Sequence, residues 1–229
     1  MTTYVIAPSP QPSIAVAGID ARFPVRRILC VGRNYAAHAR EMGKDPTREA
    51  PFFFMKPADA VVDTGSVIAY PPETKNFHHE IELVVAIGKS GSDIAEASAL
   101  DHVFGYAAGI DLTRRDLQFA ARDAGRPWEW GKAFDHSAPI APLHRASQSG
   151  HIAKGAIWLS VNGVERQRGD IADLIWSVPE IIAVASRSVR LEAGDVIMTG
   201  TPAGVGALQR GDRVLGGVAG LTDIAISVA

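Results

Sequence analysis

The chain of 229 residues has only one cysteine, Cys30, so no disulfide can form within it. Structural disulfides belong to oxidising compartments, and we therefore expect a cytoplasmic protein. Long apolar runs are also missing, because no segment approaches the roughly 20 residues that a membrane helix needs. Residues 1–13 lack the apolar centre of a signal peptide. We interpret Cys30, between Leu29 and Val31, as a buried strand residue rather than a nucleophile.

An excess of charge of one sign is absent as well. The formal net charge is −2, with 21% charged and 47% hydrophobic residues. A nucleic-acid-binding surface or a polybasic membrane segment would give a basic balance, so we expect neither partner. Prolines favour an extended lead-in over residues 1–24, and a single catalytic domain is expected over residues 25–229.

The apolar pattern predicts short strands with a few helices between them. Strands are expected at residues 27–31, 52–55, 65–70, 81–87, 103–110 and 157–161, with Asn162-Gly163 as a hairpin turn. Helices are expected at residues 34–42 with Asn34 as N-cap and Gly43 as its end, at 113–124 with Thr113 and Asp116 in a capping arrangement, and at 179–186. Because strands and helices do not alternate regularly, we predict an α+β fold with a mixed sheet curled on itself, not a doubly wound parallel sheet.

The segment 76–88 carries the main candidate for chemistry. Alternate side chains of a strand share a face, so Glu80 and Glu82 point the same way. Like charges on a face that becomes buried need a positive partner, and oxygen ligands suit Mg²⁺ or Mn²⁺. The pair equally fits a solvated strand edge, or lysine and arginine partners. Asp111, after the predicted strand 103–110, is either a third ligand or a helix N-terminal residue.

His38 and Glu41 lie three residues apart on a predicted helix and share a face. A carboxylate can orient an imidazole that accepts a proton from water, although a surface pair is the alternative for so short a motif. The turn before this helix makes it a candidate lid. Lys132 either stabilises developing negative charge or pairs with a site carboxylate. The loop 199–206 lacks the ending of a phosphate-binding P-loop, so we expect no nucleotide.

Six segments together resemble the fumarylacetoacetate hydrolase family, from about Arg27 to the C-terminus. Each is weak alone, and their order along the chain makes the resemblance specific. They are Val31–Met42, Phe54–Pro57, His78–Leu83, Gly109–Gln118, Gly131–Asp135 and Thr199–Pro202. The chain resembles the compact acylpyruvate hydrolases, and the segments Arg22–Arg27 and Ile175–Glu180 resemble the fumarylpyruvate hydrolases of gentisate breakdown.

The resemblance implies a mixed β-roll with peripheral helices, a homodimer, and one Mg²⁺ or Mn²⁺ per subunit. It implies the metal ligands Glu80, Glu82 and Asp111. It also implies the catalytic residues His38, Glu41 and Lys132. The residues that it implies for the substrate pocket are Arg33, Tyr35, Lys56, Arg115, Gln118 and Thr201.

The activity implied by the resemblance is metal-dependent hydrolysis of the C–C bond of a 2,4-diketo acid, with fumarylpyruvate giving fumarate and pyruvate. The carboxylate and 2-keto oxygens of such a substrate can chelate a cation, which makes pyruvate enolate a better leaving group. Fold does not fix reaction, so an oxaloacetate decarboxylase or a 2-hydroxy-dienoate isomerase is an alternative. The dyad of His38 and Glu41 favours hydrolysis, because decarboxylation needs no activated water. A non-catalytic keto-acid-binding protein is a remote alternative.

Overall fold

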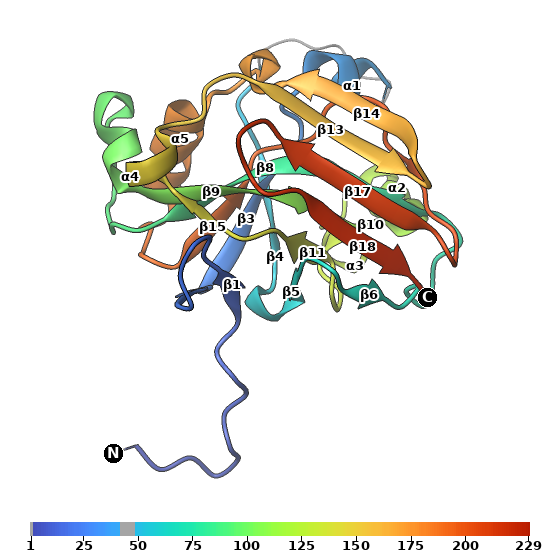
Figure 1. Ribbon diagram of the computed structural model, residues 1–229, viewed down its shortest axis with the longest axis horizontal. Helices are drawn as coiled ribbons and strands as arrows, with labels where there is room; N and C mark the ends of the chain where they lie inside the picture. The colour runs from blue at the N-terminus through green and yellow to red at the C-terminus, as the bar shows by residue number, and fades with distance from the viewer. Residues whose placement is uncertain (1, 42–48) are drawn as a thin grey trace.

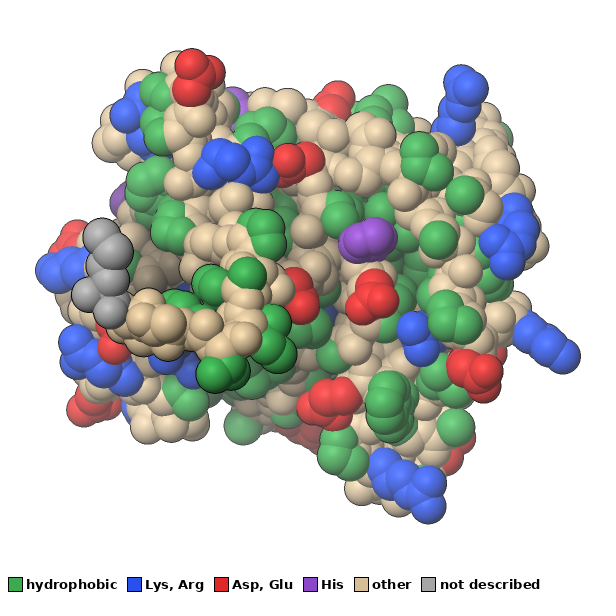
Figure 2. Space-filling model, turned by 90° about the horizontal axis from the view of Figure 1, so that it is seen from below, with side chains coloured by type: hydrophobic (Ala, Val, Ile, Leu, Met, Phe, Trp, Pro, Cys, Tyr) green, Lys and Arg blue, Asp and Glu red, His purple; other side chains and the backbone are tan. Residues whose placement is uncertain are grey.

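The structure is a computed structural model that describes residues 2–41 and 49–229. It confirms the predicted α+β architecture, in which mixed, curled sheets are flanked by helices (Figure 1). No helix among the described residues is long and apolar enough to cross a membrane. Positive and negative side chains are interspersed on the face shown in Figure 2 rather than gathered by sign.

The central sheet holds the elements that carry the candidate site. Its strands are ordered β4-β3-β15-β8-β9-β11-β5, and β12 pairs with β9. The sheet is mixed, because β15 pairs with β3 and β11 with β5 in parallel, whereas the other pairs, such as β8 with β9, are antiparallel. The bounds are β3 Arg27–Val31, β4 Phe53–Lys56, β5 Val61–Asp63, β8 Ile81–Ile87, β9 Val103–Ile110, β11 Ala138–Ile140, β12 His144–Arg145 and β15 Asp195–Met198.

A second sheet lies over one face of the central sheet, with β13, β14, β17 and β18 in front in Figure 1. Its order is β14-β13-β17-β18-β6. The predicted hairpin at Asn162-Gly163 joins β13 to β14, and both residues have the positive φ, 52° and 80°, that such a turn requires. The bounds are β6 Val67–Ile68, β13 Ala156–Val161, β14 Val164–Asp170, β17 Arg213–Val218 and β18 Ile224–Val228.

Smaller elements complete the described part of the chain. The small sheets contain β1 Ser13–Ala15 with β2 Arg22–Pro24, and β7 Phe77–His79 between β10 Thr113–Arg114 and β16 Gly206–Ala207. The helices are α1 Ala36–Glu41, α2 Arg115–Asp123, α3 Glu129–Lys132, α4 Ala146–Ser149 and α5 Val178–Ser188. Three 3₁₀ helices are η1 Ala58–Ala60, η2 Glu96–His102 and η3 Ile171–Asp173.

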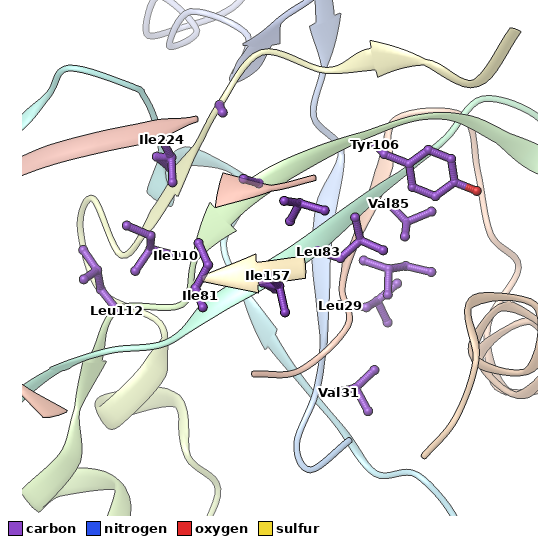
Figure 3. Close-up of a cluster of buried hydrophobic side chains, with 14 of the residues drawn as sticks. Leu29, Val31, Ile81, Leu83, Val85, Tyr106, Ile110, Leu112, Ile157 and Ile224 are labelled. Carbon is purple, nitrogen blue, oxygen red and sulfur yellow. The ribbon is translucent and has the colours of Figure 1, made fainter. Parts of the chain in front are cut away.

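Strand β8 is buried on both faces because both faces are apolar along most of its length. Ile81, Leu83 and Val85 pack toward the second sheet, in a cluster that includes Ile157 and Ile224 (Figure 3). Val84 and Ala86, which follow Glu82 on the opposite face, pack in a separate cluster. Burying each large aliphatic side chain contributes about 1.5–3 kcal/mol, so the strand that begins beside the candidate site is firmly held.

Local expectations are refined by the structure. Within the expected lead-in, β1 pairs with β2 and buries Ile14 and Phe23, and the division of the chain at residue 24 stays a prediction. The expectation that Asn34 caps α1 is wrong. The Asn34 side-chain amide instead donates to the carbonyls of Trp176 and Thr199, 2.8 Å away in each case. The expected end of this helix at Gly43 lies outside the described residues.

The capping arrangement expected at Thr113 and Asp116 is also wrong. Thr113 belongs to β10, and its hydroxyl donates to the Asp111 carbonyl at 3.0 Å. The carboxylate of Asp116 accepts from the Thr74 hydroxyl at 2.6 Å and the Lys75 N–H at 2.9 Å. Both residues therefore hold neighbouring segments to the start of α2 rather than capping it.

Candidate active site

The structure brings the three predicted metal ligands together at the start of β8. Glu80 lies between β7 and β8, Glu82 is the second residue of β8, and Asp111 directly follows β9. Because β8 and β9 are antiparallel, the Asp111 N–H donates to the Glu80 carbonyl at 2.8 Å. One oxygen from each carboxylate lies within 4.8 Å of the others, and all three residues are buried. The solvated-edge alternative is therefore excluded.

Glu80 and Glu82 have opposite electrostatic surroundings although they share a strand face. Lys132 Nζ lies 2.8 Å from one oxygen of Glu80, and the Arg115 guanidinium contacts the other. Burial opposes ionisation of Glu80, but Lys132 and Arg115 outweigh it and lower the pKa of its carboxyl group. Glu82 accepts from the Gly200 N–H at 2.7 Å and forms no ion pair with any described side chain. Burial, and then the charges of Asp111 and Glu80, raises the pKa of Glu82 well above its ordinary value.

Lys132 ends α3 and links two of the three carboxylates. Its Nζ donates to Glu80 at 2.8 Å, to Asp111 at 2.6 Å and to the Thr113 hydroxyl at 2.7 Å. Burial alone would lower the pKa of Lys132, but the charges of Asp111 and Glu80 reverse this and raise it. The lysine is therefore a protonated partner of the site carboxylates, one of the two roles expected from the sequence.

The donor set fits a hard divalent cation. Its atoms are carboxylate oxygens, the ligands that Mg²⁺ and Mn²⁺ prefer. Lys132 and Arg115 already balance much of the charge of Glu80 and Asp111, whereas Glu82 is buried with only a backbone N–H partner. Burying an ionised carboxylate without a counter-charge costs several kcal/mol. A cation bound beside Glu82 would remove that cost, so the residues present suit a bound Mg²⁺ or Mn²⁺.

The predicted dyad lies on α1, and its His38 lines a pocket together with Glu80 and Glu82. His38 Nδ1 is 3.2 Å from Glu41 Oε2, and both oxygens of Glu41 accept from the Gly204 N–H at 3.2 Å. The hydrogen bond with His38 lowers the pKa of Glu41. Because an ionised carboxylate only accepts, Nδ1 of a neutral His38 carries the proton and its Nε2 keeps a free lone pair. His38 is 5% exposed and can act as a base inside the pocket.

Four of the six predicted substrate-binding residues line this pocket, namely Arg33, Arg115, Gln118 and Thr201. Arg115 and Gln118 share a face of α2, and the Arg115 guanidinium contacts both the Gln118 side-chain oxygen and Glu80. The guanidinium of Arg33 lies 5.1 Å from the centre of the Phe52 ring. The wall of the pocket thus carries basic groups beside the carboxylate triad.

Lys56 and Tyr35 are not among the residues that line the pocket. The ammonium of Lys56 lies 2.8 Å from Asp111, donates to the Leu112 carbonyl at 3.1 Å and contacts the Lys132 carbonyl. Lys56 thus supports the triad from behind. The hydroxyl of Tyr35 is buried and has no hydrogen-bond partner among the described residues. Substrate contacts by these two side chains stay predictions.

The structure adds pocket residues that sequence reasoning missed. Phe119 and Arg122 follow Arg115 and Gln118 at helical spacing along α2, so extending the helix face by one turn would have found them. Phe54 and Trp128 complete the apolar wall, with ring centres 5.7 Å apart. No pattern in the sequence signalled Trp128, which follows a proline just before α3.

Comparison with known proteins gives consistent matches over nearly the whole chain. The sequence profile of the "Fumarylacetoacetate (FAA) hydrolase C-terminal" family matches residues 27–229. A fumarylpyruvate hydrolase from Ralstonia sp. is 46% identical over 187 residues, covering 80% of this chain and 95% of that protein. A mitochondrial oxaloacetate tautomerase from Homo sapiens is 41% identical over 203 residues, covering 89% and 91%.

A solved structure extends the likeness to three dimensions. The crystal structure of fumarylpyruvate hydrolase from Pseudomonas aeruginosa, in complex with Mn²⁺ and pyruvate, superposes with a TM-score of 0.97 at 56% identity and covers 99% of each chain. The resemblance seen in six short segments is therefore confirmed over the full sequence and fold. This chain belongs to the fumarylacetoacetate hydrolase family.

Proposed function

We propose that this protein is a hydrolase that cleaves the C–C bond of an acylpyruvate, with fumarylpyruvate and water giving fumarate and pyruvate. Glu80, Glu82 and Asp111 would hold one Mg²⁺ or Mn²⁺. The observation that carries the proposal is that His38, Glu80 and Glu82 line one pocket, so a base and a cation site face the same space. The Pseudomonas aeruginosa relative, bound to Mn²⁺ and pyruvate, supports both the metal and the keto-acid end of the substrate.

The chain's own residues can position the substrate and balance its charge. A divalent cation bound at the triad would supply Lewis acidity at the 2-keto group of the substrate. Arg33 and Arg115 offer guanidinium groups for substrate carboxylates, and the aromatic wall excludes water from the acyl chain. Lys132, already protonated beside the triad, is close enough to its carboxylates to stabilise negative charge that develops there.

The proton transfers can be assigned to the dyad. Glu41 holds the Nδ1 proton of His38, so Nε2 can remove a proton from a water molecule in the pocket. The resulting hydroxide attacks the 4-keto carbon, the bond between C3 and C4 breaks, and its electron pair stays on C3 as pyruvate enolate. The proton held by His38 is then available to convert this enolate to pyruvate.

Oxaloacetate chemistry is the second candidate, because a human relative is an oxaloacetate tautomerase. Decarboxylation of oxaloacetate leaves pyruvate enolate, and tautomerisation passes through the enolate of oxaloacetate. Decarboxylation consumes no water and needs no base, whereas tautomerisation needs a base to move a proton between C3 and the 2-oxygen. The dyad, with His38 on the pocket, therefore favours hydrolysis over decarboxylation, and the products formed from oxaloacetate separate hydrolysis from tautomerisation.

Turnover of three substrates tests the proposal. Fumarylpyruvate, acetylpyruvate and oxaloacetate should be compared with Mg²⁺ and then with Mn²⁺, and the products identified by chromatography. We expect equal amounts of fumarate and pyruvate from fumarylpyruvate, with the highest kcat/KM of the three. A preference for acetylpyruvate would contradict the fumaryl assignment and the place in gentisate degradation, and conversion of oxaloacetate alone would contradict hydrolysis. The homodimer and the cytoplasmic location stay predictions.

A further inference from the structure

Gln167 is a buried side-chain amide that joins three segments beside the pocket. It lies on β14 and is 1% exposed. Its Oε1 accepts from the Ile81 N–H at 3.1 Å and lies 2.8 Å from His79 Nδ1. Its Nε2 donates to the Pro202 carbonyl at 2.9 Å and to the Thr201 hydroxyl at 2.8 Å. The amide therefore connects the start of β8, which carries the triad, to the loop that carries Thr201.

The orientation of this amide is fixed by partners that have only one role. The backbone N–H of Ile81 can only donate, so the atom that faces it must be the Gln167 oxygen. The carbonyl of Pro202 can only accept, so the atom that faces it must be the nitrogen. A flipped amide would lose both bonds in a buried place, which costs about 1–3 kcal/mol for each unpaired group.

A fixed amide also fixes the polarity of the Thr201 hydroxyl. A hydroxyl has one proton and two acceptor lone pairs, and here one lone pair is used by the Gln167 N–H. The hydroxyl proton cannot point at that N–H and must point elsewhere. Thr201 donates to no acceptor among the described residues, and it lines the pocket. Its proton is left for whatever oxygen atom occupies the pocket.

We infer that Gln167 is a positioning residue that holds the Thr201 hydroxyl as a hydrogen-bond donor to a carboxylate or keto oxygen of the substrate. The inference rests on the proposed function for the identity of that oxygen. The backbone supports it, because a Cβ on Gly169 of β14 would lie 2.8 Å from Pro202 Cβ and one on Gly204 would lie 2.0 Å from the Arg166 carbonyl oxygen. The loop therefore lies directly against β14.

The Gln167→Glu variant tests the inference, because it changes one donor atom into an acceptor and keeps the side-chain length. The Thr201 hydroxyl would then donate to residue 167 and present lone pairs to the pocket. We expect the dissociation constant of pyruvate for the Mn²⁺-loaded protein, measured by calorimetry, to rise at least about tenfold, as for the loss of a hydrogen bond to a charged group. In turnover, KM should rise by a similar factor with kcat nearly unchanged, because the bond is present before and during the reaction.

The Thr201→Val and Thr201→Ser variants give the matched comparison. Valine has the shape of threonine without the hydroxyl, so Thr201→Val should raise the dissociation constant of pyruvate at least about tenfold. Thr201→Ser keeps the hydroxyl, and its dissociation constant should stay within about twofold of that of the wild type. In the valine background Gln167→Glu should add at most about twofold, because the group through which Gln167 acts is gone. The general cost of burying a glutamate is the same in both backgrounds. If the affinity loss of the double variant equals the product of the two single-variant losses, the inference is overturned.

The remaining outcomes are also decisive. If Gln167→Glu does not fold, equal pyruvate affinity of wild type and Thr201→Val overturns the inference by itself. A wild-type protein that binds Mn²⁺ but no pyruvate overturns it too. Absence of fumarylpyruvate turnover would contradict the proposed function alone, because the inference is read from pyruvate binding. Mn²⁺ affinity, measured by electron paramagnetic resonance, should change little in Gln167→Glu, since the acceptor facing Ile81 is retained.

Discussion

The carboxylate triad and the His38–Glu41 dyad line or adjoin one pocket but are built in different ways. The triad lies on the central sheet, where Glu80, Glu82 and Asp111 are 4%, 1% and 0% exposed. The dyad lies on α1, which is described from Ala36 to Glu41, and about a third of the Glu41 side chain is exposed. The proposed metal site is thus buried in the sheet, whereas the proposed base is paired with a carboxylate that reaches solvent.

Removing the metal should have the largest effect, because it disables the charge-holding half of the site. After dialysis against a chelator, activity should fall by more than about 10³-fold, since Lewis-acid stabilisation of charge is commonly worth several kcal/mol. Added Mn²⁺ should restore it. Glu82→Gln should bind Mn²⁺ more weakly than wild type, while Glu165→Gln, an exposed pair with Arg168, should be unchanged. Full activity in the chelated protein would remove the triad from the mechanism.

Replacing the base should have the next largest effect and should leave the triad intact. For His38→Ala we expect kcat for fumarylpyruvate to fall by about 10²–10⁴-fold, the usual contribution of a general base. Binding of Mn²⁺ and pyruvate should persist, because neither needs the imidazole. His144→Ala, whose imidazole contacts the Thr222 hydroxyl at the surface, is the control. Normal turnover in a metal-loaded His38→Ala protein is the result that rules out this role.

Neutralising the orienting carboxylate should have a smaller effect. Glu41→Gln keeps an oxygen that can accept from His38 but removes the negative charge that stabilises the imidazolium. We expect a fall in kcat of about 10-fold to 10²-fold, less than for His38→Ala. Measuring kcat of Glu41→Gln and His38→Ala under identical metal loading checks this expectation. A loss as large as that in His38→Ala would mean that Glu41 has a direct part in the chemistry.

Asp116→Asn should affect stability rather than turnover, because Asp116 holds Thr74 and Lys75 and does not line the pocket. Burial opposes ionisation, but these hydrogen bonds lower the pKa of Asp116. Its contribution is therefore present above the unfolded-state pKa of about 3.9 and is lost as the pH falls through the lower folded-state value. Urea unfolding should show a deficit of about 1–2 kcal/mol at pH 7 that shrinks at pH 3. A deficit that is equal at both pH values contradicts this explanation.

The sequence was sufficient for the strands of the central sheet. The predicted bounds 27–31, 81–87 and 103–110 are those observed, because each is a mostly apolar segment in which most residues are buried. Alternation along β8 placed Glu80 and Glu82 on one face without further information. The local pattern was enough where alternation along a strand determines on which face of the sheet a side chain lies.

The sequence was insufficient where distant segments meet. Gln167 contacts His79 across 88 residues, and Asn34 contacts Trp176 across 142, and no local rule predicts either pair. Thr113 looked like a helix cap because its local context is that of a cap, but it pairs with His78 across strands β10 and β7 and accepts a hydrogen bond from Lys132. The position of Asp111 after a predicted strand left two roles open, and the family resemblance favoured the role of metal ligand. The register of β9 against β8 supplies the physical reason why Asp111 lies beside Glu80.

The direct test of C–C bond hydrolysis is turnover of fumarylpyruvate by the Mn²⁺-loaded protein in H₂¹⁸O. The hydroxide formed at His38 should become one oxygen of the new carboxylate, so mass spectrometry should find one ¹⁸O atom from water in each fumarate. Pyruvate should be formed in the same amount as fumarate. Fumarate carboxylates do not exchange with water under neutral conditions, so no label is gained after the bond is cleaved. Formation of fumarate without ¹⁸O, or tautomerised substrate without fumarate, would contradict the account.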